Sequence, residues 1–231
     1  MSSQETLKRK SPGLFRPSLS PVPFTVRFLS RLACYVYFRF FPRRKGAPMP
    51  SKGPVIVVMN HQSYLDPILA EVSCPRMLRF LARSTLFRNR LFGGFISILG
   101  AVPIDREGSG LGGLKKAVEL LEGGSAILIF PESTRSKDGT IADFKAGFVW
   151  LARRTGATIL PIAVSGACRA WPRSNRLPRP YKIRATVLDP IRPEELAPRE
   201  GETERDAEQR AVREIRDMII AAKAGMEAPK K

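Results

Sequence analysis

Residues 54–72 read PVIVVMNHQSYLDPILAEV, and this stretch decides the fold class. Residues 54–59 form a short apolar run rich in valine and isoleucine, which predicts a strand buried on both faces. Pro67 is best tolerated in the first turn of a helix, so a helix is predicted to begin there with Asp66 as its N-cap. A buried strand, a polar turn and a helix in this order indicate an α/β protein.

The rest of the chain continues this alternation of strands and helices. Apolar runs predict further strands at 77–82, 101–105, 125–130, 158–164 and 181–190, and amphipathic segments predict helices at 111–124, 145–156 and 203–223. Thr203 and Asp206 resemble a capping box at the start of the last helix. The predicted fold is α/β, with a mixed, mostly parallel sheet flanked by helices.

The chain is strongly basic, and its charge is unevenly distributed. The formal net charge of the 231 residues is +18, while 43% of the residues are hydrophobic, enough for a packed core. Residues 1–52 carry eleven Lys and Arg against one Glu, and residues 191–231 carry nine against ten acidic residues. Such an excess requires an anionic partner. Because it lies beside an apolar segment and within the core region, it favours a membrane-surface protein that handles phosphate over a nucleic-acid binder.

Cysteine, histidine and glycine patterns exclude several classes. The three cysteines lack a C-x-x-C spacing and the chain has one histidine, so no metal site is expected and reduced thiols in a cytoplasmic compartment are predicted. Residues 108–113, GSGLGG, match a dinucleotide-binding pattern formally, but two charged residues separate them from the strand and no suitably spaced acid follows. A flexible loop is the favoured interpretation.

The N-terminal part predicts a membrane contact. Residues 1–21 are polar and are predicted to be disordered. Residues 22–41 are apolar and aromatic, with Arg27, Arg31 and Arg39 within roughly 120° of one another on a helix. Arginine near mid-membrane is costly, so a helix lying in the headgroup layer over residues 22–45 is favoured over a spanning one. A helix that packs on the core with its arginines in water is the alternative.

Charged residues at predicted strand ends suggest a site. His61 lies in the turn after the first strand, where the Asp66 carboxylate can fold back onto its ring, the arrangement that a general base needs. The alternative is a turn histidine beside a simple N-cap. Arg106 and Arg135 follow two other strands, and guanidinium groups that converge there would bind phosphate. Either arginine alone could instead be an ordinary surface residue.

Four segments in order carry a resemblance to a known family. They are NHQSYLD (60–66), GAVPIDR (100–106), FPESTRS (130–136) and ILPIAVSG (159–166). Together they resemble the motifs of the glycerol-phosphate and lysophosphatidate acyltransferase family, in particular the bacterial 1-acyl-glycerol-3-phosphate acyltransferases. The histidine-to-aspartate element alone is weak, whereas the four segments in this order are highly specific.

The resemblance implies a reaction and a catalytic pair. His61 would be the general base, with Asp66 orienting it. The base would take a proton from the free hydroxyl of lysophosphatidate, which attacks an acyl thioester carried by coenzyme A or by acyl carrier protein. The product would be phosphatidate, and no other cofactor is expected. Ser63 is expected to stabilise the turn and not to carry the acyl group.

The resemblance also implies substrate-binding and supporting residues. The acceptor phosphate and its pocket would involve Arg83, Arg106, Glu132, Ser133 and Arg135, while Asn60, Ser63 and Pro161 match supporting positions of the motifs. Arg83 stands where the family usually has lysine. Ser133 replaces the usual glycine of the third motif, which leaves another lysolipid, such as a lyso-ornithine lipid, as an alternative acceptor. A non-catalytic basic module that binds lipid or nucleic acid is a further alternative.

These inferences predict the organisation of the chain. We expect a disordered basic N-terminus (1–21), an interfacial helix (22–45), an acyltransferase domain (46–200) and a C-terminal amphipathic helix and tail (201–231). The apolar residues of 86–99 would be either a lipid-facing lip or ordinary core. The expected location is the cytoplasmic face of the cell membrane, with membrane lipids and the acyl donor as partners and no nucleic acid. No oligomeric state is predicted.

Overall fold

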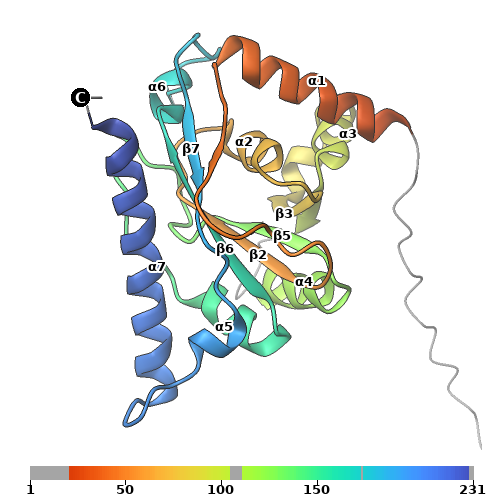
Figure 1. Ribbon diagram of the computed structural model, residues 1–231. Helices are drawn as coiled ribbons and strands as arrows, with labels where there is room; N and C mark the ends of the chain where they lie inside the picture. Colours follow the sequence, from red (N-terminus) through yellow and green to blue (C-terminus); the bar gives the residue numbers. More distant parts are fainter. Residues whose placement is uncertain (1–20, 105–110, 173, 229–231) are drawn as a thin grey trace, which may run out of the picture.

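The computed structural model describes residues 21–104, 111–172 and 174–228. Within these residues the centre is a seven-stranded sheet in the order β1-β7-β6-β2-β5-β3-β4 (Figure 1). The strands are β1 (Arg43–Arg44), β2 (Val55–Met59), β3 (Leu78–Arg83), β4 (Ala101–Ile104), β5 (Ala126–Ile129), β6 (Thr158–Ser165) and β7 (Arg184–Val187). Neighbouring strands are parallel except β6 and β7, which are antiparallel. The predicted fold class is confirmed.

Helices cover both faces of this sheet (Figure 1). They are α1 (Pro21–Tyr37), α2 (Asp66–Ser73), α3 (Arg90–Ile98), α4 (Leu111–Glu122), α5 (Gly147–Thr155), α6 (Ala167–Ala170) and α7 (Glu204–Glu227), with 3₁₀ turns η1 (Ser84–Phe87) and η2 (Pro193–Leu196). The apolar residues predicted at 86–99 thus belong mainly to η1 and α3. The predicted strand at 181–190 is shorter than expected, because the regular pairing of β7 with β6 covers only Arg184–Val187.

Strand β2 lies at the centre and divides the core in two. Val55, Val57 and Met59 pack into the cluster that includes α2, whereas Ile56 and Val58 pack into the cluster that includes α4, α5 and α7. This separation follows from the two-residue period of a strand. All five side chains are fully buried, and each contributes about 1.5–3 kcal/mol of transfer free energy. The position of the loop after β2 is therefore rigidly determined.

The start of α2 differs from the prediction by one residue. Asp66 was expected to be the N-cap, but it is the first helical residue, and the N-cap is Leu65 with no side-chain capping bond. The Asp66 carboxylate still accepts hydrogen bonds from backbone N–H groups, those of Gln62 and Ser63 in the preceding turn. At the start of α7 the capping box formed by Thr203 and Asp206 is confirmed.

Helix α1 is shorter than the helix predicted over residues 22–45, because it ends at Tyr37 and Arg43–Arg44 form strand β1. Arg27 forms an ion pair with Glu71 of α2 at 2.7 Å, and Arg31 donates to the Cys74 carbonyl oxygen at 3.3 Å. Arg27 and Arg31 therefore face the protein, where the buried carboxylate of Glu71 and the carbonyl oxygen of Cys74 accept their hydrogen bonds. The large apolar residues that remain exposed on α1 are Phe28, Leu29, Leu32 and Val36. Of the helices in the described ranges, none is long and apolar enough to cross a membrane.

Candidate active site

His61 lies in the loop between β2 and α2, at the carboxyl end of the central parallel strands. Its Nδ1 is 2.7 Å from Oδ2 of Asp66. The same Oδ2 accepts hydrogen bonds from the backbone N–H groups of Gln62 at 2.5 Å and Ser63 at 2.7 Å. Three contacts on one oxygen fix the carboxylate, and the carboxylate in turn fixes the imidazole. The contact foreseen from the sequence is present.

The two partners differ in exposure. Asp66 has no exposed surface, while the side chain of His61 keeps 18% of its surface exposed. Burial raises the pKa of Asp66, and its hydrogen bonds with His61, Ser63 and Gln62 oppose that rise. If Nδ1 carries the proton that Asp66 accepts, Nε2 is the free acceptor of the ring. The pair is thus arranged as a base whose carboxylate partner is shielded from water.

The aromatic ring of Phe130 stacks on one face of the His61 ring. The centroids of the two rings are 3.9 Å apart, with an angle of 13° between the planes. Phe130 directly follows β5, which pairs with β2 in parallel, so the contact depends on sheet order. Phe130 was not predicted from the sequence to be part of the site. Its only signal was an aromatic residue at the start of the FPESTRS segment.

Glu132 supports the loop through its carboxylate. One oxygen accepts the N–H of His61 at 2.7 Å, and the other accepts the N–H of Ala142 at 3.0 Å. Burial raises the pKa of Glu132, and these two backbone hydrogen bonds oppose the rise. Glu132 was expected to line the acceptor pocket. In the structure it lies beside His61 and ties the histidine loop to the segment before α5.

Arg135 lies over a neighbouring aromatic ring. Its guanidinium carbon is 3.5 Å from the centroid of Tyr64, which is a close cation–π contact. The adjacent Ser136 donates its N–H to the carbonyl oxygen of His61 at 2.8 Å, so the two loops are joined. Nη1 of Arg135 is buried and has no hydrogen-bond partner among the described residues. A buried donor of this kind is suited to an anionic ligand.

The remaining candidate substrate residues have different surroundings. Arg83 is exposed at the carboxyl end of β3, and Ser133 is exposed with a φ of 60°. Arg106 lies outside the described residues, as do Gly108 to Gly110 of the glycine-rich segment. Glu132, Ser133 and Arg135 therefore share the loop after β5, while Arg83 approaches from the next strand in the sheet order.

The three supporting residues join the loop to β6 and α6. Asn60 donates to the Val164 carbonyl oxygen at 3.0 Å and accepts the Val164 N–H at 2.8 Å. The Ser63 hydroxyl donates to the Trp171 carbonyl oxygen at 3.2 Å and accepts the N–H of Leu65 at 3.3 Å. Pro161 is buried in β6 opposite Val58.

The described part of the chain offers no metal cluster and no disulfide. Groups of three or more His, Cys, Asp or Glu side chains that could hold a metal ion are absent from it. Cys34, Cys74 and Cys168 are free thiols. Burial raises the pKa of Cys34 to about 11 and that of Cys74 to about 12, so neither is a ready nucleophile.

The histidine–carboxylate pair lies at the carboxyl end of a mostly parallel sheet, with Arg135 on the loop after β5 and Arg83 at the end of β3. In α/β proteins this end of the sheet is where ligands bind, and a hydrogen-bonded pair of this kind is the arrangement of a general base. Residues 42–165 match the family model described as Acyltransferase. The chain therefore belongs to the acyltransferase family, as its motifs had indicated.

Relatives from plants and bacteria are similar to this chain. It is 36% identical over 171 residues to the 1-acyl-sn-glycerol-3-phosphate acyltransferase LPAT1, chloroplastic, of Arabidopsis thaliana, covering 73% of this chain and 48% of that protein. It is 29% identical over 119 residues to the 1-acyl-sn-glycerol-3-phosphate acyltransferase of Bacillus subtilis, covering 51% and 59%. The chain thus spans about half the length of the plant relative.

A solved structure shares the fold. The crystal structure of the 1-acyl-sn-glycerophosphate (LPA) acyltransferase PlsC from Thermotoga maritima superimposes with a TM-score of 0.70. The alignment covers 91% of this chain and 81% of the other, at 23% identity. This likeness supports the α/β arrangement, including its mixed sheet.

Proposed function

We propose that this protein transfers a fatty acyl group from an acyl thioester to the free hydroxyl of lysophosphatidate, giving phosphatidate. The observation that carries the proposal is the 2.7 Å contact between His61 and the buried Asp66, at the strand ends where α/β proteins bind ligands. The names of the plant and bacterial relatives supply the acceptor, since both are called 1-acyl-sn-glycerol-3-phosphate acyltransferases.

The proposed chemistry is a direct transfer with general base catalysis. Nε2 of His61 accepts the proton of the acceptor hydroxyl as its oxygen attacks the thioester carbonyl. The tetrahedral intermediate then collapses, the carbon–sulfur bond breaks, and the imidazolium returns the proton to the leaving thiolate. Asp66 stabilises the imidazolium between these steps. No electron is gained or lost, so the reaction needs no redox cofactor.

The acceptor phosphate is proposed to bind the arginines of the site. The strongest support is the buried Nη1 of Arg135, which has no hydrogen-bond partner in the described part of the chain, because a phosphate oxygen would complete its hydrogen bonding. Arg83 and Arg106 are the further proposed contacts, from the ends of two other strand segments. Ser63 is not proposed as an acyl carrier, since its hydroxyl is used by Trp171 and Leu65.

We further propose that the protein works at a membrane surface, on the cytoplasmic side, as a peripheral or monotopic protein. Helix α1 and α6, which follows the carboxyl end of β6, lie at the same end of the molecule (Figure 1). The exposed apolar residues of α1 are joined there by those of α3, where Leu91 is 88% exposed. Both substrates of the proposed reaction contain fatty chains, so a membrane contact would bring the site to them.

An acceptor panel tests the proposed function. Purified protein would be given lysophosphatidate, lysophosphatidylglycerol, lysophosphatidylcholine or a lyso-ornithine lipid, each with acyl-CoA and with acyl carrier protein as donor. We expect lysophosphatidate to give the highest kcat/KM, measured by mass spectrometry of the acylated product. Absence of phosphatidate formation with both donors would refute the proposal.

The side chain of Ser133 is the reason for including a lyso-ornithine lipid as a second candidate acceptor. Ser133 adds an exposed side chain next to Glu132, where the family motif usually has glycine. An acceptor with a different headgroup could use that hydroxyl. A higher kcat/KM for the lyso-ornithine lipid than for lysophosphatidate would favour this second candidate.

A further inference from the structure

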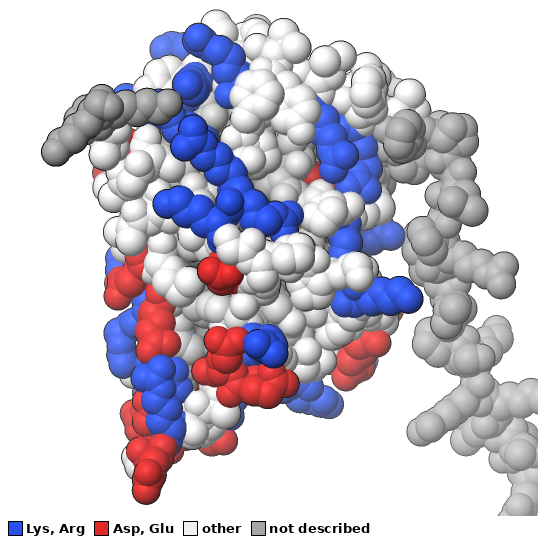
Figure 2. Space-filling view, in the orientation of Figure 1, with Lys and Arg blue, Asp and Glu red and all other residues white. Residues whose placement is uncertain are grey.

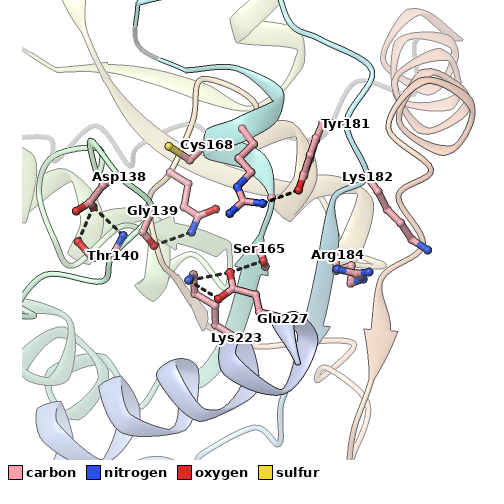
Figure 3. A pocket seen from close by; sticks show the side chains of 13 residues that line it. Asp138, Gly139, Thr140, Ser165, Cys168, Tyr181, Lys182, Arg184, Lys223 and Glu227 are labelled. Atoms are coloured by element: carbon pink, nitrogen blue, oxygen red, sulfur yellow. Dashed lines mark hydrogen bonds and ion pairs between the residues drawn. The ribbon is translucent and has the colours of Figure 1, made fainter. Parts of the chain in front are cut away.

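A cavity of about 380 Å³ opens beside the catalytic loop (Figure 3). Gln62, the neighbour of His61, lines it together with Ser165 and Gly166 at the end of β6. Gly166 has a φ of 88°, and a Cβ there would lie 2.6 Å from the Lys182 carbonyl oxygen. Only glycine fits this turn, which leads the chain from β6 into α6 at the wall of the cavity.

Positive charge dominates the wall of this cavity. Its charged side chains are Arg169, Lys182, Arg184 and Lys223 against Asp138 and Glu227. Lys223 is paired with Glu227 at 2.9 Å, and Asp138, which accepts the hydroxyl of Thr140 at 2.7 Å, keeps its negative charge (Figure 3). Arg169, Lys182 and Arg184 form no ion pair with any carboxylate in the described ranges. Arg169 donates to the Tyr181 hydroxyl at 2.9 Å, a contact that leaves its charge uncompensated, so the three cations still outnumber the one unpaired carboxylate among the described residues of the cavity.

Gln62, one of the residues that line the cavity, carries a buried hydrogen-bond acceptor. The side chain of Gln62 is only 2% exposed, and its Nε2 donates to the Gly139 carbonyl oxygen at 3.1 Å. Its Oε1 has no hydrogen-bond partner within the described residues. A buried acceptor without a donor lowers the stability of the folded protein, and a ligand that donates an N–H or O–H group to this oxygen would remove that penalty.

A second cavity, of about 460 Å³, adjoins the first and shares Lys182, Arg184 and Glu227 with it. It adds Arg39, Arg43 and Lys45, from the segment between α1 and the sheet edge. Lys and Arg side chains gather on this face of the molecule, whereas acidic side chains collect toward the far end of α7 (Figure 2). The two cavities together form a cationic groove, one wall of which includes Gln62, the residue that follows His61.

We propose that this groove binds the phosphopantetheine and nucleotide part of an acyl-CoA donor, an inference that rests on the proposed function. The amide N–H groups of pantetheine would donate to Gln62 Oε1, and the phosphates would contact Arg169, Lys182 and Arg184. The second cavity would hold the nucleotide. Two concave cavities of several hundred cubic ångströms suit a small ligand, whereas a carrier protein would require a broad contact surface.

The experiment compares two variants of the full chain with equal charge loss. The test variant is Lys182→Gln with Arg184→Gln, and the control is Arg205→Gln with Arg213→Gln, which changes two exposed arginines of α7. Adenosine 3′,5′-bisphosphate binding is measured by titration calorimetry. Acyl transfer is measured with acyl-CoA, with S-acyl-pantetheine, which has no phosphate, and with acyl carrier protein.

We expect the unmodified chain and the control to bind the bisphosphate, and the test variant to bind it at least about tenfold more weakly, since charge-assisted contacts are lost. The ratio of kcat/KM for acyl-CoA to that for S-acyl-pantetheine should fall by a similar factor, through KM and not kcat, because these contacts bind ground and transition state alike. Equal losses in the control would overturn the inference.

Other outcomes separate this inference from the proposed function. If the unmodified chain acylates lysophosphatidate from acyl-CoA but binds no bisphosphate, the groove assignment is wrong and the function stands. If the bisphosphate binds but no lysolipid is acylated from either donor, the proposed function is wrong and the nucleotide groove stands. A test variant whose KM rises for acyl carrier protein alone would overturn the assignment to coenzyme A.

Discussion

At the residue scale, the proposed base is His61, held by Asp66 on one side and by Phe130 on the other. General base catalysis typically contributes 10²–10⁴-fold in rate. We expect His61→Ala to lower kcat by about that factor and to leave the fold intact, because the removed ring is partly exposed. Thiol release from acyl-CoA measures the rate, and circular dichroism measures the fold.

Ser63→Ala is the matched variant in the same loop. It removes one hydroxyl that bonds to Trp171 and Leu65, which should cost about 1 kcal/mol of stability. Its kcat should stay within about threefold of the unmodified enzyme, by analogy with the modest effect of one supporting hydrogen bond. Wild-type turnover in His61→Ala would exclude this histidine as the base, and loss of all turnover in Ser63→Ala would point to an acyl-serine.

Ser133 stores backbone strain at the site. Its φ of 60° lies in the left-handed region, which costs a non-glycine residue about 1–2 kcal/mol. Ser133→Gly should remove that cost. Glycine also gives the unfolded chain more conformational freedom, which lowers the stability of the folded state by about 0.5–1 kcal/mol and offsets part of the gain. We expect a net gain of about 0–1.5 kcal/mol in the free energy of unfolding, measured with urea.

Ser133→Val provides the opposite change at the same position. A β-branched residue is poorly tolerated at positive φ, so this variant should lose about 1–2 kcal/mol. If glycine and valine have equal effects, the backbone of Ser133 is not strained in solution.

Some of the residue contacts could be predicted from the sequence and others could not. Pro67 limits where a helix can begin, which made a contact between His61 and Asp66 possible, but the four motifs in order were needed to favour that contact over a turn histidine. The stacking of Phe130 and the two backbone contacts of Glu132 depend on β5 pairing beside β2. Strand order is a property of the whole sheet, so no local pattern reveals it.

At the element scale, α1 packs on α2 through a buried carboxylate. Burial raises the pKa of Glu71 to about 7, while the N–H of Leu78 and the charge of Arg27 oppose that rise. The amphipathic pattern predicted a side that carries Arg27 and Arg31, whereas Arg39, predicted on the same side, lies beyond the end of α1 at Tyr37. The pattern did not predict which side faces the domain, because the deciding partner, Glu71, is far away in the sequence.

The raised pKa predicts a pH dependence of stability. The folded protein holds the Glu71 proton up to about pH 7, above which the ionised carboxylate pairs with Arg27, whereas the unfolded chain releases the proton near 4.5. The unfolded state therefore binds fewer protons between these values, and the free energy of unfolding falls as pH rises, by about 3 kcal/mol for this group. Below pH 4.5 this loss is absent, and above pH 7 it is complete.

Glu71→Gln isolates that contribution. The amide can still accept the Leu78 N–H, so the variant should show a smaller decline of unfolding free energy between pH 4.5 and 8 in urea titrations. Glu200→Gln, an exposed site, is the control and should keep the decline of the unmodified protein. An unchanged slope in Glu71→Gln would mean that Glu71 is ionised throughout this range.

At the scale of the whole molecule, two kinds of surface lie near the site. The exposed apolar residues of α1 and α3 form one, and the cationic face seen in Figure 2 forms the other. The total charge of +18 was evident from the sequence. Its concentration along the cationic groove was not, because that groove joins residues 39–45 to residues 169–184 and 223 through the pairing of β1 with β7.

These two surfaces predict that membrane binding has an electrostatic contribution, from the cationic face, and an apolar contribution, from α1 and α3. Flotation with vesicles containing anionic lipid should recover the unmodified protein at low salt. At 1 M salt, where the screening length falls to about 3 Å, the electrostatic part should vanish and the apolar part should remain. Leu32→Glu with Val36→Glu should remove the apolar part, so this variant should leave the vesicles at high salt.

The control variant is Trp150→Glu with Met218→Glu, which changes exposed apolar residues on α5 and α7 and should float like the unmodified protein at both salt concentrations. If the α1 variant also floats unchanged at 1 M salt, α1 is not the membrane-binding surface.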